Sequence, residues 1–230
     1  MATFLLIHSP RVGALTWPLV ADELRRAGHQ VIVPNLFAAP DETLPYWQQH
    51  ANAVAQAVDA ETLAADPILV AHSGAGPLLP AIEQTLKRPI GGSIFADAGL
   101  PKNNASRLDL FGFPDEVRQF RESAVDGILP NWTADDLREV IPDDMVRRAF
   151  VADLPHLPLA VYEEPLPVFS AWPDTPCAYL HFSAGYDVSA LEAQALGWPY
   201  TKLDGEHFHM LVDAPAVAAA LIDLSRKIGR

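Results

Sequence analysis

Short apolar runs alternate with longer amphipathic segments throughout this chain, and the alternation restricts the folds that it can adopt. The apolar runs cover residues 4–7, 31–33, 68–70, 93–96 and 178–182, and a further short strand is expected at 199–203. Runs of this length are typical of buried strands, and the segments between them are long enough for helices. Parallel strands need such crossover connections. We therefore expect an α/β fold with a doubly wound, mainly parallel six-stranded sheet and helices on both faces.

The expected helices carry recognisable end signals. They cover about 17–27, 45–60, 188–196 and 214–227, and one more runs from the turn at 72–74 to about residue 86. In the first helix, Thr16 occupies the N-cap position and Gly28 follows the last apolar residue, as a helix terminator does. With 230 residues, the chain suits one large domain or two small ones.

A long segment between the fourth and fifth expected strands, about 100–176, differs from the rest of the chain. It contains many of the 21 prolines and no convincing strand. We expect three short helices in it, at 115–124, 134–140 and 143–152, with Thr133 and Pro142 at two of their starts. Aromatic side chains are interleaved with the prolines: Phe111, Phe113, Trp132, Phe150, Tyr162 and Phe169.

We interpret this segment as a helical cap inserted after the fourth strand. Open α/β sheets bind ligands at the carboxyl edge of their strands, and a cap would fold over that edge. The predicted division is therefore 1–99 and 177–230 for the α/β core, and 100–176 for the cap. The alternative is a helical insertion with no role in binding.

Charge and cysteine content narrow the classes of partner and compartment. The net charge is −13, from 16 Lys and Arg against 29 Asp and Glu, and such a chain repels phosphate backbones and anionic lipid. We expect no nucleic-acid and no membrane partner, although solubility alone explains the acidity. The single cysteine, Cys177, excludes an internal disulfide and CxxC motifs, which fits a cytoplasmic protein. The apolar run at 4–7 is too short for a signal peptide or a transmembrane span.

The stretch at 68–77 has the most specific pattern in the chain. An apolar strand leads into Ala-His-Ser-Gly-Ala at 71–75, and a helix is expected after it. A serine that presents its hydroxyl above a sheet must lie in a strained turn, where bulky side chains two positions to either side would clash. Ala71 and Ala75 are both small, so the pattern predicts a nucleophile elbow with Ser73 as the nucleophile. A serine in an ordinary tight turn is the alternative.

Three segments, in this order, resemble the α/β-hydrolase superfamily. They are 5–17, which begins Leu-Leu-Ile-His-Ser-Pro, the turn at 71–76, and 204–210, which reads Asp-Gly-Glu-His-Phe-His-Met. The chain is similar in particular to small bacterial hydrolases of the esterase and hydroxynitrile-lyase-like branch. This resemblance implies a catalytic triad in the order serine, acid, histidine, with the histidine after the last strand. The resemblance does not extend to the cap.

His207 and His209 both lie where the resemblance implies the general base. In the superfamily this histidine follows a small or polar pair and precedes an apolar residue by three places, and His207 with Met210 matches that pattern. We therefore predict His207 as the base and His209 as a pocket or packing residue. A metal site at these two histidines would lack the further ligands that a metallohydrolase needs, so we expect no metal.

Two aspartates are candidates for the acid. Asp97 ends the fourth expected strand and Asp187 follows the fifth. The superfamily uses either place for its acid, the later one more often. Because the sequence turns helical directly after Asp187, its simpler role is the N-cap of a helix that starts at Val188. Against Asp97, solvated aspartates are common at strand ends. We predict Asp97 as the acid, hydrogen-bonded to His207, and keep Asp187 as the alternative.

The oxyanion hole is the least regular part of the pattern. The N–H of Gly74, at the start of a helix, supplies one donor. Ser9 and Pro10 occupy the segment that in the superfamily usually lends a second backbone N–H, and proline has none. Either Arg11 or the side chain of Ser9 takes over, or the hole is weak.

These residues predict a cofactor-free serine hydrolase that cleaves a small, largely apolar ester, thioester or lactone through an acyl-enzyme on Ser73. Because loss of one oxyanion donor costs a factor of about 10²–10³, Pro10 keeps two alternatives open. One is a cofactor-free lyase, cyclase or isomerase in which Ser73 and His207 transfer a proton. The other is a catalytically silent ligand-binding protein of the same fold.

Overall fold

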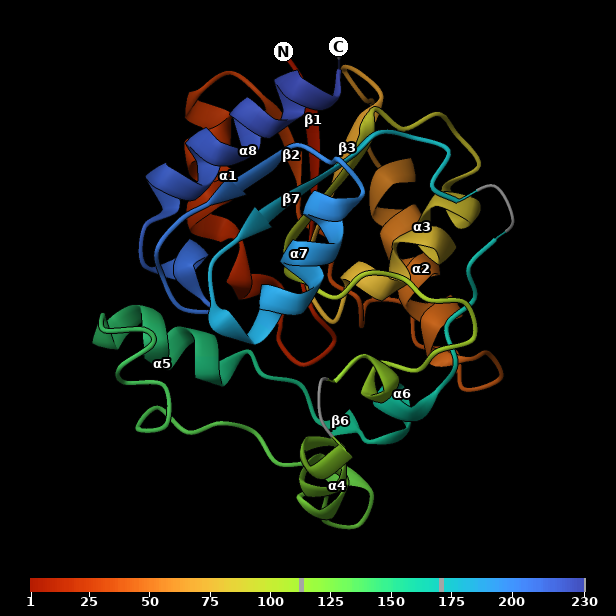
Figure 1. Ribbon diagram of the computed structural model, residues 1–230, viewed down its shortest axis with the longest axis vertical. Coiled ribbons are helices and arrows are strands. Elements are labelled where there is room, and N and C mark those ends of the chain that lie inside the picture. Colours follow the sequence, from red (N-terminus) through yellow and green to blue (C-terminus); the bar gives the residue numbers. More distant parts are fainter. Residues whose placement is uncertain (112–113, 170–171, 230) are drawn as a thin grey trace.

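A sheet of six strands forms the centre of the computed structural model, which describes residues 1–111, 114–169 and 172–229 (Figure 1). The order of the strands is β2-β1-β3-β4-β7-β8, and every neighbouring pair is parallel. The predicted fold class is confirmed. The strands are β1 (Thr3–Ile7), β2 (Gln30–Ile32), β3 (Pro67–Ser73), β4 (Gly92–Ala98), β7 (Cys177–His181) and β8 (Tyr200–Lys202).

Helices cover both faces of the sheet, because successive strand residues point to opposite sides and both sides are apolar. Phe4 and Leu6 pack with α1 and α8 on one face, while Leu5 and Ile7 pack with α2, α3 and α7 on the other (Figure 1). None of the described helices is long and apolar enough to cross a membrane. The helices that cover the sheet are α1 (Pro18–Arg26), α2 (Tyr46–Asp59), α3 (Leu79–Leu86), α7 (Asp187–Ala195) and α8 (Ala214–Ile228).

Proline accounts for two of the helix starts that differ from the prediction. Thr16 is not the N-cap of α1, because the helix begins at Pro18 and the Thr16 hydroxyl donates instead to the carbonyl of Gly13, at 2.8 Å. The chain after the predicted elbow first forms a 3₁₀ turn at Gly76–Leu78, and α3 follows it. Pro77 and Pro80 lie in these first turns, where their missing N–H groups do least harm.

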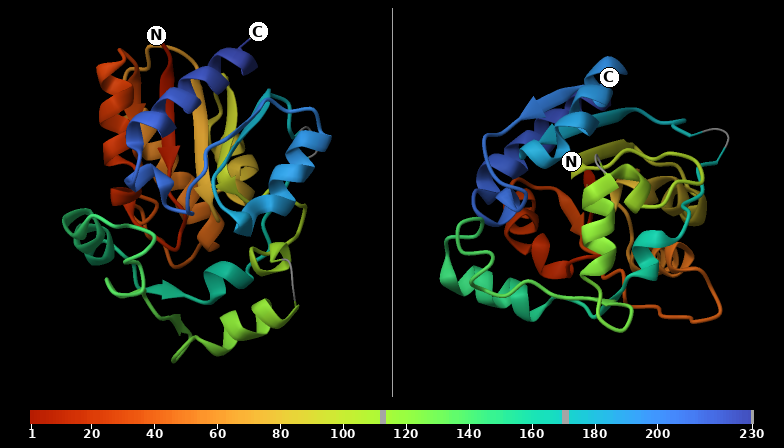
Figure 2. Two further views of the ribbon diagram at one scale, coloured as in Figure 1. Left: turned by 60° about the vertical axis from the view of Figure 1, so that its left-hand side comes forward. Right: turned by 60° about the horizontal axis from the view of Figure 1, so that its bottom comes forward.

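The segment between β4 and β7 lies beyond the edge at which the sheet strands end (Figure 2). Its helices are α4 (Pro114–Glu122), α5 (Asp144–Ala152) and α6 (Ala160–Glu163). The expectation that it holds no strand was wrong, since β5 (Ile128–Leu129) and β6 (Leu157–Pro158) form a short antiparallel pair. Phe113, one of the aromatic residues expected in this segment, lies outside the described residues. The division into core and cap stays a prediction.

The helix expected at 134–140 is also absent, and this part of the chain forms consecutive turns. The stretch is only seven residues long, too short to form a helix by itself. Pro142 disfavours helical geometry at the residue before it, so a helix here could not extend toward the C-terminus beyond residue 140. Thr133 and Asp136 exchange side-chain-to-backbone hydrogen bonds, which close the turn locally. The neighbouring helix α5 does form, capped by Asp143, whose carboxylate accepts from the N–H of Val146.

Candidate active site

Ser73 ends the central strand β3 in a conformation that few residues adopt. Its φ is +57°, in the left-handed region, which costs free energy for a residue with a Cβ and is typical of functional turns. Ala71 and Ala75, the two small residues of the predicted elbow, are both fully buried. A further small residue is required at Gly76, where a Cβ would overlap the carbonyl oxygen of Gly99. The local sequence therefore folds into the predicted strand–turn–helix.

The close approach at Gly76 has a measurable consequence. Gly76→Ala is expected to lower the free energy of unfolding by about 1–3 kcal/mol, because the added methyl group forces the turn away from Gly99. Chemical denaturation measures this change. Gly185→Ala is the matched control, since the nearest atom to a Cβ there is the Ser183 hydroxyl oxygen, at 3.8 Å. Equal stabilities of the two variants would contradict the close approach.

His207 and Asp97 form a direct pair beside this turn. The Nδ1 atom of His207 lies 2.7 Å from Oδ2 of Asp97, so the hydrogen bond expected between these two residues is present. Asp97 is fully buried at the end of β4, also with a positive φ, of 46°. Its carboxylate accepts three more hydrogen bonds, from the N–H groups of Phe182 and Ser183 and from the Ser183 hydroxyl. Burial raises the pKa of Asp97, but hydrogen bonds from His207 and Ser183 outweigh it and hold the pKa below its ordinary value.

Asp187 lies elsewhere, and its predicted role as a helix cap was wrong. Helix α7 begins at Asp187 itself, with Tyr186 at the N-cap position and no side-chain capping bond. The carboxylate of Asp187 is more than half exposed, and its Oδ1 lies 3.2 Å from Nε2 of His181. From the first helical position its carboxylate turns to His181 rather than to the N–H groups of its own helix. Of the two candidate acids, Asp97 is the one that contacts His207.

His209 does not line the cavity around Ser73. It begins a short 3₁₀ turn at His209–Leu211, and its ring packs against that of Phe182, with centroids 5.6 Å apart. Gly205 makes room for the ring, because a Cβ there would overlap it. Of the two roles expected for this histidine, the structure therefore places it in packing and not in the pocket.

Ser9, one of the predicted oxyanion residues, lies beside Gly74, directly after Ser73. A Cβ on Gly74 would lie 3.1 Å from the Ser9 hydroxyl oxygen and 3.4 Å from that of Tyr162, so two hydroxyl groups flank this glycine. Pro10 is buried and contributes no N–H. The backbone N–H of Arg11 donates to the Ser9 hydroxyl oxygen at 3.3 Å.

Two arginines connect this part of the site to the segment that we interpret as the cap. Arg107 is almost completely buried, and it donates to the carbonyls of Gly74 and Val161, at 2.8 and 2.7 Å. Burial lowers the pKa of Arg107. The side chain of Arg11 donates to the carbonyl of Pro130 at 2.6 Å and lies 4.9 Å from the ring centroid of Trp132.

Tyr186 is the site residue that the sequence analysis missed. Its hydroxyl lies 2.8 Å from the Ser73 hydroxyl, and its ring stacks on that of His207, with centroids 5.0 Å apart and planes inclined by 13°. Burial raises the pKa of Tyr186. In the described part of the chain, Tyr186 provides the one hydrogen bond to the Ser73 hydroxyl, and His207 does not reach it. The only signal in the sequence was an aromatic residue beyond a strand end, beside Asp187.

A second ring lies against His207. The ring centroid of His72 is 4.4 Å from that of His207, and the Nε2 atom of His72 lies 3.0 Å from the carbonyl oxygen of His207. Because His72 is fully buried, and because His207 is close by, the pKa of His72 lies well below its ordinary value. A neutral His72 thus supports the His207 ring without adding a charge next to it.

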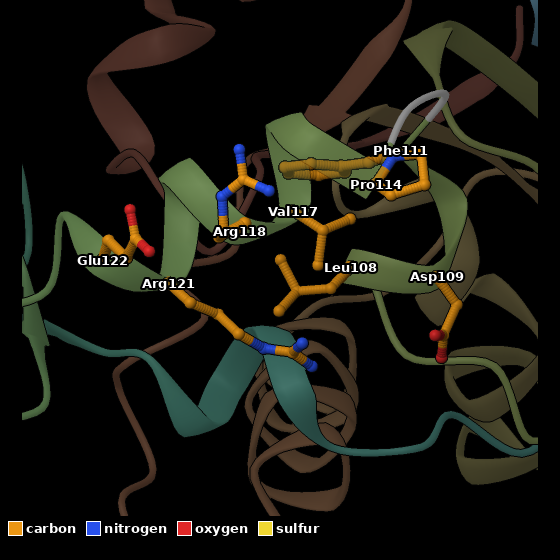
Figure 3. A pocket seen from close by; sticks show the side chains of 8 residues that line it. All are labelled: Leu108, Asp109, Phe111, Pro114, Val117, Arg118, Arg121 and Glu122. Carbon is orange, nitrogen blue, oxygen red and sulfur yellow. The ribbon is translucent and has the colours of Figure 1, made fainter.

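These groups open into a cavity of about 530 Å³ between the sheet edge and the 100–176 segment. Its lining includes Ser73, Tyr186 and His207 together with the aromatic side chains of Phe120 and Trp132. A second cavity is lined by side chains of α4 and of residues 108–111 (Figure 3), and Ser73, Tyr186 and His207 are not among its lining residues. Nowhere in 1–111, 114–169 or 172–229 do three or more His, Cys, Asp or Glu side chains gather as metal ligands would.

Comparison with known proteins identifies relatives along nearly the whole chain. A carbendazim-hydrolysing esterase of Nocardioides sp. (strain SG-4G) is 27% identical over 241 residues, which cover 94% of this chain and 96% of that protein. An extracellular alpha/beta-hydrolase from a Paenibacillus species has a similar structure, with a TM-score of 0.78 at 23% identity over 100% of both chains. A pyrethroid hydrolase from Sphingobium faniae JZ-2 gives 0.70 at 17% identity, over 98% of this chain and 97% of that one.

The structural similarities, all below 25% identity, concern the fold. The family assignment comes from the sequence itself, which matches the model of the alpha/beta hydrolase family over residues 4–221. That range includes every sheet strand but the first residue of β1, together with Ser73, Asp97 and His207. The chain belongs to the α/β-hydrolase family.

Proposed function

We propose that this protein is a serine hydrolase that cleaves a small, largely apolar ester, thioester or lactone through an acyl-enzyme on Ser73. The observation that carries the proposal is the 2.7 Å contact between His207 and the buried carboxylate of Asp97, beside a serine held in a strained turn. An ionised Asp97 accepts the hydrogen on Nδ1 of His207. The Nε2 atom of the ring is then unprotonated and can act as a base.

The reaction follows from this tautomer. Nε2 of His207 takes the proton of the Ser73 hydroxyl while Oγ attacks the carbonyl carbon of the substrate. The N–H of Gly74 and the hydroxyl of Ser9 supply donors to the oxyanion, so that a side chain replaces the N–H that Pro10 lacks. His207 then returns the proton to the leaving group as the acyl-enzyme forms. Water, activated by the same histidine, hydrolyses the acyl-enzyme.

The cavity and the relatives support an ester or a related acyl compound as the substrate. Aromatic and aliphatic side chains such as Leu100, Phe120 and Trp132 line the cavity, which favours a largely apolar molecule. One relative is described as an esterase that hydrolyses carbendazim, and a protein of similar structure as a pyrethroid hydrolase.

One observation favours a second candidate function. The Ser73 hydroxyl bonds to Tyr186 and not to His207, whereas a working nucleophile and base must exchange a proton. Catalytic hydrogen bonds often tighten only when the substrate binds, and the serine-hydrolase proposal requires this here. If the Ser73–His207 contact never forms, the protein is a ligand-binding member of the fold or a lyase in which the groups move protons without an acyl-enzyme.

Covalent labelling distinguishes these functions. We expect a fluorophosphonate probe to form one stable adduct on Ser73, detected by intact mass and peptide mapping. Ser73→Ala should give no adduct. Ser189→Ala should be labelled like the wild type, because Ser189 lines the same cavity but lies in helix α7. A wild-type protein that is not labelled would contradict the acyl-enzyme and favour the second candidate.

A further inference from the structure

Tyr186 and the oxyanion residues reach Ser73 from opposite sides. In the sheet, β3 lies between β1 and β4, and β7 follows β4. Ser9 and Arg11 come directly after β1, while Tyr186 comes after β7. A substrate carbonyl whose oxygen points to Gly74 and Ser9 therefore turns its other substituents toward the β7 side. Tyr186 lines the cavity on that side.

The position of Tyr186 is fixed by the same carboxylate that holds His207. Ser183 binds Asp97 through both its N–H and its hydroxyl, at 3.0 and 2.6 Å. Its carbonyl in turn accepts from the N–H of Tyr186 at 3.1 Å, which closes a 3₁₀ turn at Ala184–Tyr186. The phenol and the imidazole are thus both anchored to Asp97, and their rings stack. Such double anchoring keeps the hydroxyl of Tyr186 near the group that delivers a proton to the leaving group.

The phenol is suited to donate a hydrogen bond. Burial raises the pKa of Tyr186, so the phenol keeps its proton at neutral pH. When it donates to the oxygen of Ser73, at 2.8 Å, the serine keeps its own proton for His207. After Oγ has bonded to the acyl carbon, it becomes an ester oxygen and a weaker acceptor. Negative charge then develops on the leaving-group oxygen, a stronger acceptor.

We propose that Tyr186 is a catalytic residue that donates its hydroxyl hydrogen bond to the leaving-group oxygen as the acyl-enzyme forms. In this step the bond from Oγ of Ser73 to the acyl carbon is already made, and the bond from that carbon to the leaving oxygen breaks. The electron pair goes to the leaving oxygen, and the proton comes from Nε2 of His207. Tyr186 transfers no proton and stabilises the developing charge. The inference rests on the proposed function.

The test compares two acetate esters that differ in their need for help at the leaving group. The 4-nitrophenolate of 4-nitrophenyl acetate leaves easily, whereas the alkoxide of benzyl acetate leaves poorly. Tyr186→Phe keeps the ring that stacks on His207 and removes only the hydroxyl. We expect it to lower kcat/KM for benzyl acetate by about 10- to 100-fold, the loss of one hydrogen bond to a charged group. For 4-nitrophenyl acetate the loss should be less than about threefold, because little charge needs stabilising.

Tyr200→Phe is the matched control. It removes one hydroxyl that bonds to His181 at 2.9 Å, outside the cavity, and should leave both rates unchanged. If Tyr186→Phe lowered kcat/KM equally for the two esters, Tyr186 would have a merely structural role and the inference would be overturned. An unchanged kcat/KM for benzyl acetate would overturn it as well. If the fluorophosphonate probe labels Ser73 in the wild type, such a result rejects the inference alone. If wild-type Ser73 is not labelled, the proposed function fails and the inference fails with it.

Discussion

Ser73→Ala is expected to lower kcat/KM for 4-nitrophenyl acetate by a factor on the order of 10⁶, and His207→Ala to lower it by a similar factor. A nucleophile and its base act as a unit, so the loss of either removes the same reaction path. The double variant should therefore be little worse than either single variant. Steady-state kinetics of the three proteins measure this. The residual rate would come from the remaining oxyanion donors and from binding.

The neighbouring histidine provides the matched control. His209 packs against Phe182 and does not line the cavity, so His209→Ala should alter stability more than the chemical step. Among the described residues, the Ser73 side chain makes one hydrogen bond, to Tyr186. We therefore expect Ser73→Ala to keep the wild-type fold by circular dichroism. A large kinetic loss in His209→Ala with none in His207→Ala would show that the base is the other histidine. Unchanged turnover by Ser73→Ala would reject the acyl-enzyme.

Features that depend on neighbouring residues could be predicted from the sequence. The small residues around Ser73 and the apolar strand before it determine the turn locally, and the structure has that turn, with φ at +57°. Five of the six strands could be predicted because they coincide with short apolar runs between turn residues. The sixth, β8, reads Tyr-Thr-Lys, and only its place after the expected helix at 188–196 indicated it. Asp97 could be proposed as a partner of His207 because strand ends of a parallel sheet share one edge.

Features that depend on contacts between distant parts of the chain could not be predicted from the sequence. Tyr186 meets Ser73 over a separation of 113 residues, through a turn anchored on Asp97, and no spacing rule encodes that meeting. The role of Asp187 depended on the residue at which α7 begins. Because the helix begins one residue earlier than predicted, Asp187 is its first residue and contacts His181 instead of capping the helix. The short β5–β6 pair was missed because two-residue strands have no periodicity to detect.

Asp97→Asn is expected to lower kcat/KM by about 10⁴-fold while leaving the elbow in place. An asparagine amide at this position can donate to Nδ1 of His207, which favours the tautomer with hydrogen on Nε2. That tautomer cannot accept the proton of Ser73. Asp187→Asn is the control: its carboxylate is more than half exposed and contacts His181, so turnover should be unchanged and stability altered by less than about 1 kcal/mol.

Asp97→Asn should also change how the free energy of unfolding depends on pH, and this change can be measured without a substrate. Burial raises the pKa of Asp97, but hydrogen bonds from His207 and Ser183 bring it below its value in the unfolded chain. Its ionised carboxylate therefore stabilises the fold fully above about pH 4, and this contribution is lost as the pH falls through the lower folded-state pKa. The stability of the wild type relative to Asp97→Asn, measured by denaturation against pH, should fall in that acid range. A difference independent of pH, together with a large kinetic loss in Asp187→Asn, would assign the acid to Asp187 and leave the role of Ser73 untouched.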